Sequence, residues 1–369
     1  MSAELPKDTA QQLHKIAARL SKIKTVVGFD GFVDTILQVV KTRQSPTKYE
    51  PYARMAEWGE RVVAAAGVSA NFEFAQQMVK LGGNGPIMAN ALTSIGLPLT
   101  YIGCLGHPTL HWVFSEFAKR AHVISIAEPG YTDALEFEDG KLMFGKHQSL
   151  KEVNWANLLQ HVPEAKLIKL FREAEFVAMV NWTMLTNLTE VLQKLLTRVF
   201  AKLGGTRKWV FFDLADPAKR SREDLLAVVK LIAKFEKHAR VILGLNLGEA
   251  RQVAEVLGLG EIEETYGTVA HAASRIREVL KVDTVVVHPI EFAAASDATG
   301  SAYVVGPFIS KPKITTGAGD HFNAGFCLGR ILGLDLASSV QAGVASSGFY
   351  VRTAKSPRIA DLVKLLRTL

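Results

Sequence analysis

The stretch Thr315-Thr316-Gly317-Ala318-Gly319-Asp320-His321-Phe322-Asn323-Ala324-Gly325-Phe326 carries most of the information about the fold of this chain. Apolar residues at Phe322, Phe326 and Ile331 have the spacing of a helix, so a turn of small residues precedes the helix N-terminus. The backbone N–H groups of such a turn can point at one spot, where the helix dipole also favours negative charge. The stretch therefore predicts an anion-binding turn. Asp320, in the first helical turn, either caps the helix or acts on a ligand held there.

Outward from this stretch, short apolar and β-branched runs alternate with helical patterns. The runs are 25–29, 99–104, 176–180, 209–213, 241–245 and 284–287, and the helical patterns include 9–20, 185–203 and 222–237. This alternation predicts an α/β fold with a doubly wound, mostly parallel sheet and helices on both faces. Ligands of such a sheet bind at the carboxyl ends of its strands. No Pro/Ser-rich linker divides residues 1–369, so we expect a single domain.

One segment breaks this alternation. Two apolar runs, 134–137 and 142–144, flank Glu138-Asp139-Gly140-Lys141, and Asp-Gly is a strong hairpin signal. A two-stranded hairpin is marginal on its own, so we expect it to pack on the mouth of a binding site or on a second subunit. The prediction is a small β lid formed by residues of about 131–149 and 35–50.

The segment between these lid elements is polar at first. Residues 41–52 include two prolines and are interpreted as a loop, and a helix is expected over residues 55–66.

The composition excludes several classes of protein. The chain has 369 residues, of which 48% are hydrophobic and 21% charged, as in a globular protein with a sizeable core. Lys and Arg exceed Asp and Glu by 43 to 36, but they form no long run and do not alternate with aromatic residues, so we expect no nucleic-acid partner. No apolar stretch approaches the roughly 18 residues of a membrane span, so we expect no membrane partner. Two cysteines, Cys104 and Cys327, exclude a disulfide framework and agree with a cytoplasmic location.

Three further motifs stand in order with the stretch 315–326. They are Gly28-Phe29-Asp30-Gly31-Phe32-Val33-Asp34, Gly82-Gly83-Asn84-Gly85-Pro86-Ile87-Met88-Ala89-Asn90-Ala91-Leu92 and Asn246-Leu247-Gly248-Glu249. Together the four motifs cover roughly residues 26–352 and resemble the signatures of the ribokinase-like, or phosphofructokinase B-type, carbohydrate kinase family. Each motif alone is a hypothesis, whereas agreement of all four in order is improbable by chance.

The resemblance implies transfer of a phosphoryl group from ATP to a hydroxyl of a sugar or sugar-like substrate. It implies that Asp320 is the catalytic base that takes the proton from this hydroxyl. The amides of Gly317, Ala318 and Gly319 would form the anion hole, and Thr316 would contact the nucleotide. These roles suit phosphoryl transfer, which needs alignment and charge stabilisation more than covalent chemistry.

The same resemblance implies a Mg²⁺ ion, organised by Asn246 and Glu249 mostly through water. It also implies a sugar site at the carboxyl edge of the sheet. The residues of that site would be Asp30, Asp34, Gly82, Gly83, Asn84 and Asn181. Turn and cap chemistry accounts for Asp30 and Asp34 as well. It also accounts for Asn181 and Asp213, which stand at the ends of two predicted strands.

Some positions depart from the family pattern. Ile314 replaces the Asp that opens the C-terminal signature, so we expect an activity that needs Mg²⁺ but not K⁺. Ile87 stands at an Asn position of the N-terminal signature, which moves or removes one sugar contact. His288 stands where the family has a Gly-containing nucleotide loop. The 47 residues between Asp34 and Gly82 suggest an elaborated lid or an oligomer contact.

Two other functions remain open on the sequence. The first is a nucleoside or other small-alcohol kinase of the same family, although two Asp residues near the first strand suit a polyol better than an aromatic base. The second is a catalytically weak sugar-binding regulatory protein, suggested by Ile314, Ile87 and His288. Asp320 beside an anion hole favours the enzyme. A homodimer, the identity of the sugar and its hydroxyl, and prior phosphorylation of the acceptor also stay open.

Overall fold

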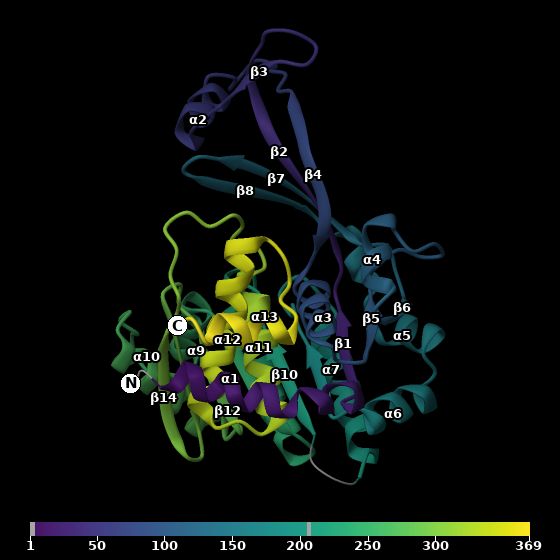
Figure 1. The fold of residues 1–369 in the computed structure, drawn as a ribbon. Helices are drawn as coiled ribbons and strands as arrows, with labels where there is room; N and C mark the ends of the chain where they lie inside the picture. Colours follow the sequence, from purple (N-terminus) through teal and green to yellow (C-terminus); the bar gives the residue numbers. More distant parts are fainter. Residues whose placement is uncertain (1–3, 205–207) are drawn as a thin grey trace.

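The computed structural model describes residues 4–204 and 208–369. Among these residues, nine strands form one large sheet (Figure 1). Across the sheet they are β14 (Gly300–Val305), β13 (Phe292–Asp297), β12 (Thr284–Val287), β11 (Arg240–Leu245), β10 (Trp209–Asp213), β9 (Phe176–Met179), β1 (Thr25–Phe29), β5 (Leu99–Gly103) and β6 (His122–Ser125). Neighbouring strands from β6 to β12 are parallel, whereas β13 and β14 join at one edge as an antiparallel pair.

The buried strands alternate their side chains between two cores. Val26 and Val210 pack on one side of the sheet, and their neighbours Val27 and Phe211 pack on the other. Because both sides are covered, the strands are continuous apolar runs. This is why the runs 25–29, 209–213 and 284–287 predicted β1, β10 and β12 with their observed bounds.

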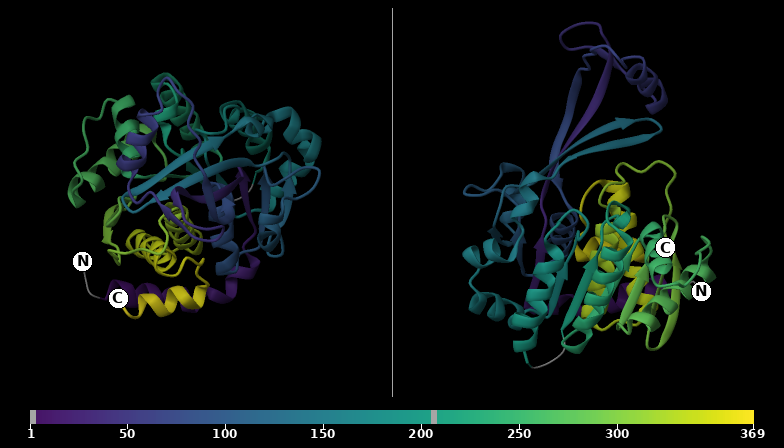
Figure 2. Two further views of the ribbon diagram at one scale, coloured as in Figure 1. Left: turned by 90° about the horizontal axis from the view of Figure 1, so that it is seen from above. Right: turned by 180° about the vertical axis from the view of Figure 1, so that it is seen from behind.

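Helices cover both faces of the sheet (Figure 2). The core on one face contains residues of α1 (Leu5–Ile16), α3 (Asn84–Ile95), α4 (Ser115–Ala118), α11 (Ala318–Leu332), α12 (Leu336–Thr353) and α13 (Ile359–Leu366). The core on the other face contains residues of α5 (Trp155–His161), α6 (Glu164–Glu173), α7 (Leu188–Lys194), α8 (Arg222–Lys234), α9 (Leu247–Val256) and α10 (Tyr266–Leu280). The large sheet and these helices are called the body below, and they confirm the predicted doubly wound α/β fold. Within the described residues, no helix is long and apolar enough to cross a membrane.

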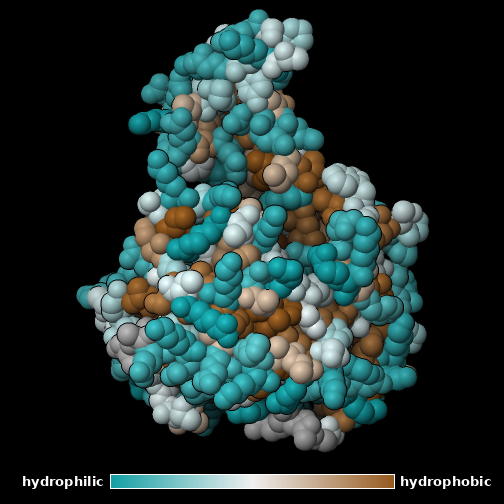
Figure 3. Space-filling model, in the orientation of Figure 1, coloured by the Kyte–Doolittle hydropathy of each residue, from teal (hydrophilic) through white to brown (hydrophobic). Residues whose placement is uncertain are grey.

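A second, smaller sheet projects from the body beyond β1 (Figure 1). It contains β2 (Phe32–Arg43), β3 (Tyr49–Pro51), β4 (Phe74–Gly82), β7 (Gly130–Phe137) and β8 (Gly140–Lys146), with α2 (Met55–Val63) near its tip. The chain enters it directly from β1, so it stands over the carboxyl ends of the parallel strands. Hydrophilic side chains cover most of its tip, and apolar ones gather nearer its base (Figure 3).

The predicted hairpin is confirmed as β7 and β8, in which Phe137 pairs with Gly140. The predicted loop 41–52 is wrong in part, because β2 continues to Arg43 and β3 follows at Tyr49–Pro51. Residues 41–43 are polar and exposed, so they lack the apolar alternation that marks a strand, and the pairing with β3 extends β2 instead.

Two predicted helices differ from the structure at their ends. The pattern 185–203 becomes α7, then a π-helical turn at Leu195–Val199 and a 3₁₀ turn at Phe200–Lys202. The pattern 9–20 begins earlier, at Leu5 with a proline in the first turn, and ends in a 3₁₀ turn at Ala17–Lys22. Apolar periodicity fixes which residues face the core, but it does not separate these helical types.

Candidate active site

The N-termini of α3 and α11 meet where the small sheet joins the body. Asn84 is the first residue of α3, and its Nδ2 donates to Asp320 Oδ1 in the first turn of α11, 3.0 Å away. Gly83 and Gly317, which precede the two helices, both have a φ of +92°, a left-handed conformation that disfavours other residues. Two motifs that lie 236 residues apart thus form one site.

The turn before α11 presents backbone amides at this junction. The amide of Ala318 donates to Thr315 O at 3.1 Å and closes the turn. Among the described residues, the amides of Gly317 and Gly319 donate no hydrogen bond. An anion at the helix N-terminus would therefore meet these two amides first.

Asp320 is the buried carboxyl group of this junction, with 8% of its surface exposed. Burial raises its pKa well above the usual value for Asp, and the negative charge of nearby Asp30 raises the pKa further. A carboxylate with a raised pKa holds a proton more readily near neutral pH, which is the property a general base needs.

Asp30 lies beneath this junction and has no exposed surface. Its Oδ1 accepts from the Gly85 amide at 2.8 Å, and its Oδ2 accepts from Asn181 Nδ2 at 2.7 Å. Burial raises the pKa of Asp30 to about 6. Its carboxylate thus ties the start of α3 to the segment after β9, and Asn181 faces Asp30 rather than open space.

Asp34 lies on the small sheet, where its charge and that of Asp320 both act on Lys80. It pairs across the strands with Lys80 on one side and Thr132 on the other. Burial raises the pKa of Asp34, and burial lowers the pKa of Lys80. A Cβ atom at Gly82 would lie 2.4 Å from the Asp34 carboxylate, so only glycine leaves room for this carboxylate there.

The hairpin of the small sheet touches the turn before α11. Lys141, at the start of β8, donates from Nζ to the Thr316 side chain, across 175 residues of sequence. From the sequence, the segment Glu138 to Lys141 was predicted only to form a hairpin turn. Nothing local to Lys141 indicated its partner, which depends on how the small sheet packs on the body.

Asn246 and Glu249 hold each other at the N-terminus of α9. The Asn246 side chain accepts from the Glu249 amide and the Glu249 side chain accepts from the Asn246 amide, both at 2.9 Å. The other Glu249 oxygen accepts from the Asp216 amide at 2.9 Å. The two residues are therefore a capping box in addition to any role toward a cation.

Unpartnered oxygens lie beside this capping box. Asp213 Oδ1 and Asn323 Oδ1 are buried without a hydrogen-bond partner among the described residues, and Asn323 Nδ2 donates to Asp213 Oδ2 at 3.0 Å. Burial raises the pKa of Asp213, as do the charges of Glu249 and Asp320. Hard oxygen donors in an acidic environment fit Mg²⁺. In the described part of the chain, no cluster of three or more His, Cys, Asp or Glu is placed to hold a metal ion.

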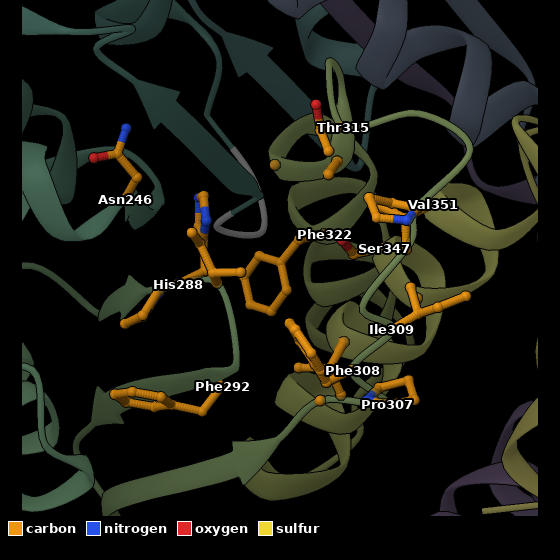
Figure 4. A pocket seen from close by; sticks show the side chains of 18 of the residues that line it. Asn246, His288, Phe292, Pro307, Phe308, Ile309, Thr315, Phe322, Ser347 and Val351 are labelled. Carbon is orange, nitrogen blue, oxygen red and sulfur yellow. The ribbon is translucent and has the colours of Figure 1, made fainter. Parts of the chain in front are cut away.

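A cavity of about 540 Å³ lies beside the turn before α11 (Figure 4). Its walls are largely apolar, with a few polar side chains. They include Phe292, Pro307, Phe308, Ile309, Phe322 and Val351, together with Asn246, His288, Thr315 and Ser347. The rings of His288 and Phe322 lie 4.9 Å apart. Burial lowers the pKa of His288 to about 4, so the imidazole is neutral. An apolar cavity that ends at the turn before a helix N-terminus has the form of a nucleotide site.

The carbonyl groups of the same turn already have protein partners. Tyr350 Oη donates to Thr316 O at 3.0 Å, and His321 Nδ1 lies 2.7 Å from Gly317 O. Burial lowers the pKa of His321 to about 4. Ile87, the second departure from the family pattern, packs against Gly317.

Two solved structures illustrate the fold. The ribokinase of Arabidopsis thaliana, solved with ribose and ATP, aligns with a TM-score of 0.64 at 15% identity, over 94% of this chain and 99% of that one. The nucleoside kinase of Methanocaldococcus jannaschii, an archaeal member of the ribokinase family, aligns with a TM-score of 0.61 at 17% identity, over 95% and 100%. The chain therefore has the fold of the ribokinase-type kinases.

Sequence comparison narrows this class. The ketohexokinase of Haloferax volcanii is 32% identical over 341 residues, which cover 92% of this chain and 89% of that protein. The sequence model of the prokaryotic ketohexokinase family matches residues 4–368. The chain belongs to this family and is a carbohydrate kinase. The family resemblance of the four motifs is thereby confirmed, and the carbohydrate kinase is favoured over the nucleoside kinase and the binding protein.

Proposed function

We propose that the protein transfers the γ-phosphoryl group of ATP to a hydroxyl group of a ketohexose, with Asp320 as the general base. The observation that carries the proposal is the position of Asp320. Its buried carboxyl group lies in the first turn of α11, next to Ala318 and Gly319 of the cavity wall, and it accepts from Asn84 at the start of α3. Membership of the prokaryotic ketohexokinase family supports the substrate class.

ATP would bind with its base in the apolar cavity and its phosphates toward the turn. Phe322 and the neutral His288 offer flat surfaces for the base, and Thr315 and Gly319 line the end that leads to the turn. The free amides of Gly317 and Gly319 would then hold oxygens of the γ-phosphoryl group, where charge develops during transfer.

The transfer needs one proton acceptor. The substrate hydroxyl oxygen forms a bond to the γ-phosphorus as the bond to the β-phosphate oxygen breaks, and its proton passes to the Asp320 carboxylate. Asn84, which donates to Asp320 Oδ1, would orient that carboxylate. Because a high pKa strengthens a base but also protonates it, activity would fall in acid as Asp320 takes up a proton.

Mg²⁺ would be held through water near Asp213 and Glu249, and it would neutralise charge on the transferring phosphates. Asn246, already engaged in the capping box, lines the nucleotide cavity from the same side. The free oxygens of Asp213 and Asn323 support this arrangement.

The sugar would lie between Asp320 and the small sheet. Asp34, a buried carboxyl group of the small sheet, would accept hydrogen bonds from sugar hydroxyls. Asp30 and Asn181 would instead act as positioning residues, because they bond each other and α3. Gly82 and Gly83 would leave space for the sugar, since a Cβ atom at Gly82 would meet Asp34 and one at Gly83 would meet Asp30.

The small sheet would act as a lid. Its hairpin already reaches the turn through Lys141 and Thr316, so closure brings a positive charge to the phosphoryl group and removes water from the site. Water would otherwise compete with the sugar hydroxyl for the phosphoryl group.

A second copy of the chain would cover part of the small sheet. Exposed apolar side chains lie along it, among them Phe74, Met78, Met143 and Phe144, and such a group favours a protein interface. Sedimentation analysis at micromolar concentration should give a homodimer, and a purely monomeric species would contradict this part of the proposal.

The substrate assignment is tested by an ATP-consumption screen with the purified protein and Mg²⁺. Ketohexoses, aldohexoses, hexose phosphates and nucleosides are compared at equal concentration, and the phosphorylated product is identified by mass spectrometry. We expect a ketohexose to give the highest kcat/KM. Preference for a nucleoside, or no transfer to any sugar, would contradict the proposal.

A further inference from the structure

A second cavity, of about 510 Å³, lies between α3, the end of β4 and the segment that follows α12. It shares no lining residue with the nucleotide cavity. The residues that line it are Lys80, Leu81, Ile87, Asn90, Thr93, Ser94, Arg120, His321, Tyr350, Ala354, Lys355, Ser356 and Arg358. We call it the cationic pocket.

The lining of the cationic pocket has positive side chains and no acidic one. Its cations are Lys80, Arg120, Lys355 and Arg358. Arg358 forms an ion pair with Asp361 at 3.0 Å, and Lys80 faces the charge of Asp34. Arg120 and Lys355 form no ion pair with any residue in the ranges 4–204 and 208–369. Positive charges around one concave surface attract an anion.

The polar groups of the pocket fix one of these cations in place. Arg120 Nη2 donates to Asn90 Oδ1, and Asn90 Nδ2 donates to Ser356 Oγ at 3.0 Å. The remaining N–H groups of the Arg120 guanidinium form no hydrogen bond with the described side chains. Lys355, two residues after the end of α12, also lines the pocket. Arginine with lysine nearby is the pairing that suits phosphate oxygens.

We propose that the cationic pocket binds a small phosphate-bearing anion, either free phosphate or a phosphate monoester. Its volume suits a ligand of that size. The inner wall is formed by His321 and Tyr350, whose rings stack 3.6 Å apart and bond Gly317 O and Thr316 O. A bound anion would thus lie one side chain away from the turn before α11. The inference does not depend on the proposed reaction.

The test is equilibrium dialysis of the whole protein with radiolabelled inorganic phosphate at constant ionic strength. The variant Arg120→Gln/Lys355→Gln removes two exposed charges of the pocket. The matched control Lys15→Gln/Lys22→Gln removes two exposed charges from the N-terminal helix and the turn after it. Lys80 is left in place because it also faces Asp34.

We expect saturable binding to the wild-type protein and the control, and affinity at least about 10-fold weaker in the pocket variant. If unlabelled glucose 6-phosphate displaces the label at lower concentration than unlabelled phosphate does, the ligand is an ester; if not, it is phosphate itself. Equal affinity in the pocket variant and the wild type would place the phosphate elsewhere and overturn the proposal. Absence of saturable binding at millimolar phosphate would also overturn it. Unchanged melting temperatures establish that the variants are folded, and the single variant Lys355→Gln serves if the double variant is not.

Discussion

The body and the small sheet build the same site by different means. In the body, one short motif fixes the geometry: Gly317 turns the chain, α11 starts, and Asp320 is buried in its first turn. In the small sheet, the proposed site residues Asp34 and Lys141 come from separate strands, and their positions depend on strand register and packing.

The body and the small sheet are therefore expected to contribute differently to catalysis. On the proposed mechanism, the chemistry of the body would depend on the electrostatics of a few buried groups. The contribution of the small sheet would depend on closure, because contacts such as that of Lys141 with Thr316 connect it to the turn. Substitutions in the body should therefore change the rate of transfer, and substitutions in the small sheet should change how well transfer is coupled to the sugar.

The largest effect is expected at Asp320. Asp320→Asn keeps the shape and the acceptor for Asn84 but loses the proton affinity, so kcat should fall by about 10²–10⁴-fold. The melting temperature should not fall, because the neutral amide avoids burying a charge. Asp335→Asn, at the N-cap of α12, is the matched control and should keep wild-type kinetics. Near wild-type turnover in Asp320→Asn would show that Asp320 is not the general base.

The next effect concerns Asp30 and the pH dependence of stability. Its native pKa of about 6 lies above the usual 3.8, so the stability it contributes is present below pH 3.8 and is lost as pH rises to about 6. The free energy of unfolding of the wild type, relative to Asp30→Asn, should therefore fall by roughly 2 kcal/mol between pH 4 and pH 7. Urea unfolding of both proteins at each pH measures this difference, and a difference that stays constant would show that Asp30 is not a buried carboxylate.

A smaller effect is expected from the hairpin. Lys141→Met should lower kcat by roughly 10–100-fold and leave ATP affinity nearly unchanged. This loss is smaller than the roughly 10²–10³-fold loss expected when a fixed donor of an anion hole is removed. Lys146→Met is the control, because Lys146 lies on the same strand but pairs with Asp133 at 2.7 Å, away from the turn. Equal kinetics in the two variants would mean that the small sheet contributes no charge to transfer.

The smallest effect is expected from monovalent cations. Tyr350 and His321 already bond the Thr316 and Gly317 carbonyl groups, and Ile314 provides no carboxylate. Replacing Na⁺ by K⁺ at equal ionic strength should therefore leave kcat unchanged within the scatter of the assay. Several-fold stimulation by K⁺ would show that a cation site exists despite these contacts.

The sequence predicted the body well because its signals are local. Buried parallel strands are apolar runs, and the turn before α11 combines glycines with a helix start, so β1, β10, β12 and the Asp320 region follow from short segments. The family resemblance assigned Asn84 and Asp320 to one site, but neither segment predicted the hydrogen bond between their side chains.

The small sheet was less predictable for physical reasons. The end of β2 is polar and exposed, so no periodicity marks it, and β4 carries little apolar alternation. The partners of Lys141 and Asp213 depend on tertiary packing across more than a hundred residues. Apart from its position after a strand, the sequence around Asp213 gave no signal of its unpartnered oxygen.

The central claim is that the small sheet closes over the body so that the sugar, and not water, receives the phosphoryl group. The most direct test replaces residues 136–144 by a short Gly/Ser link and measures ATP hydrolysed per sugar phosphorylated. The account predicts that this ratio rises and the sugar KM increases, while ATP binding changes little. An unchanged ratio, with only a lower melting temperature, would contradict it and make the hairpin a purely structural element.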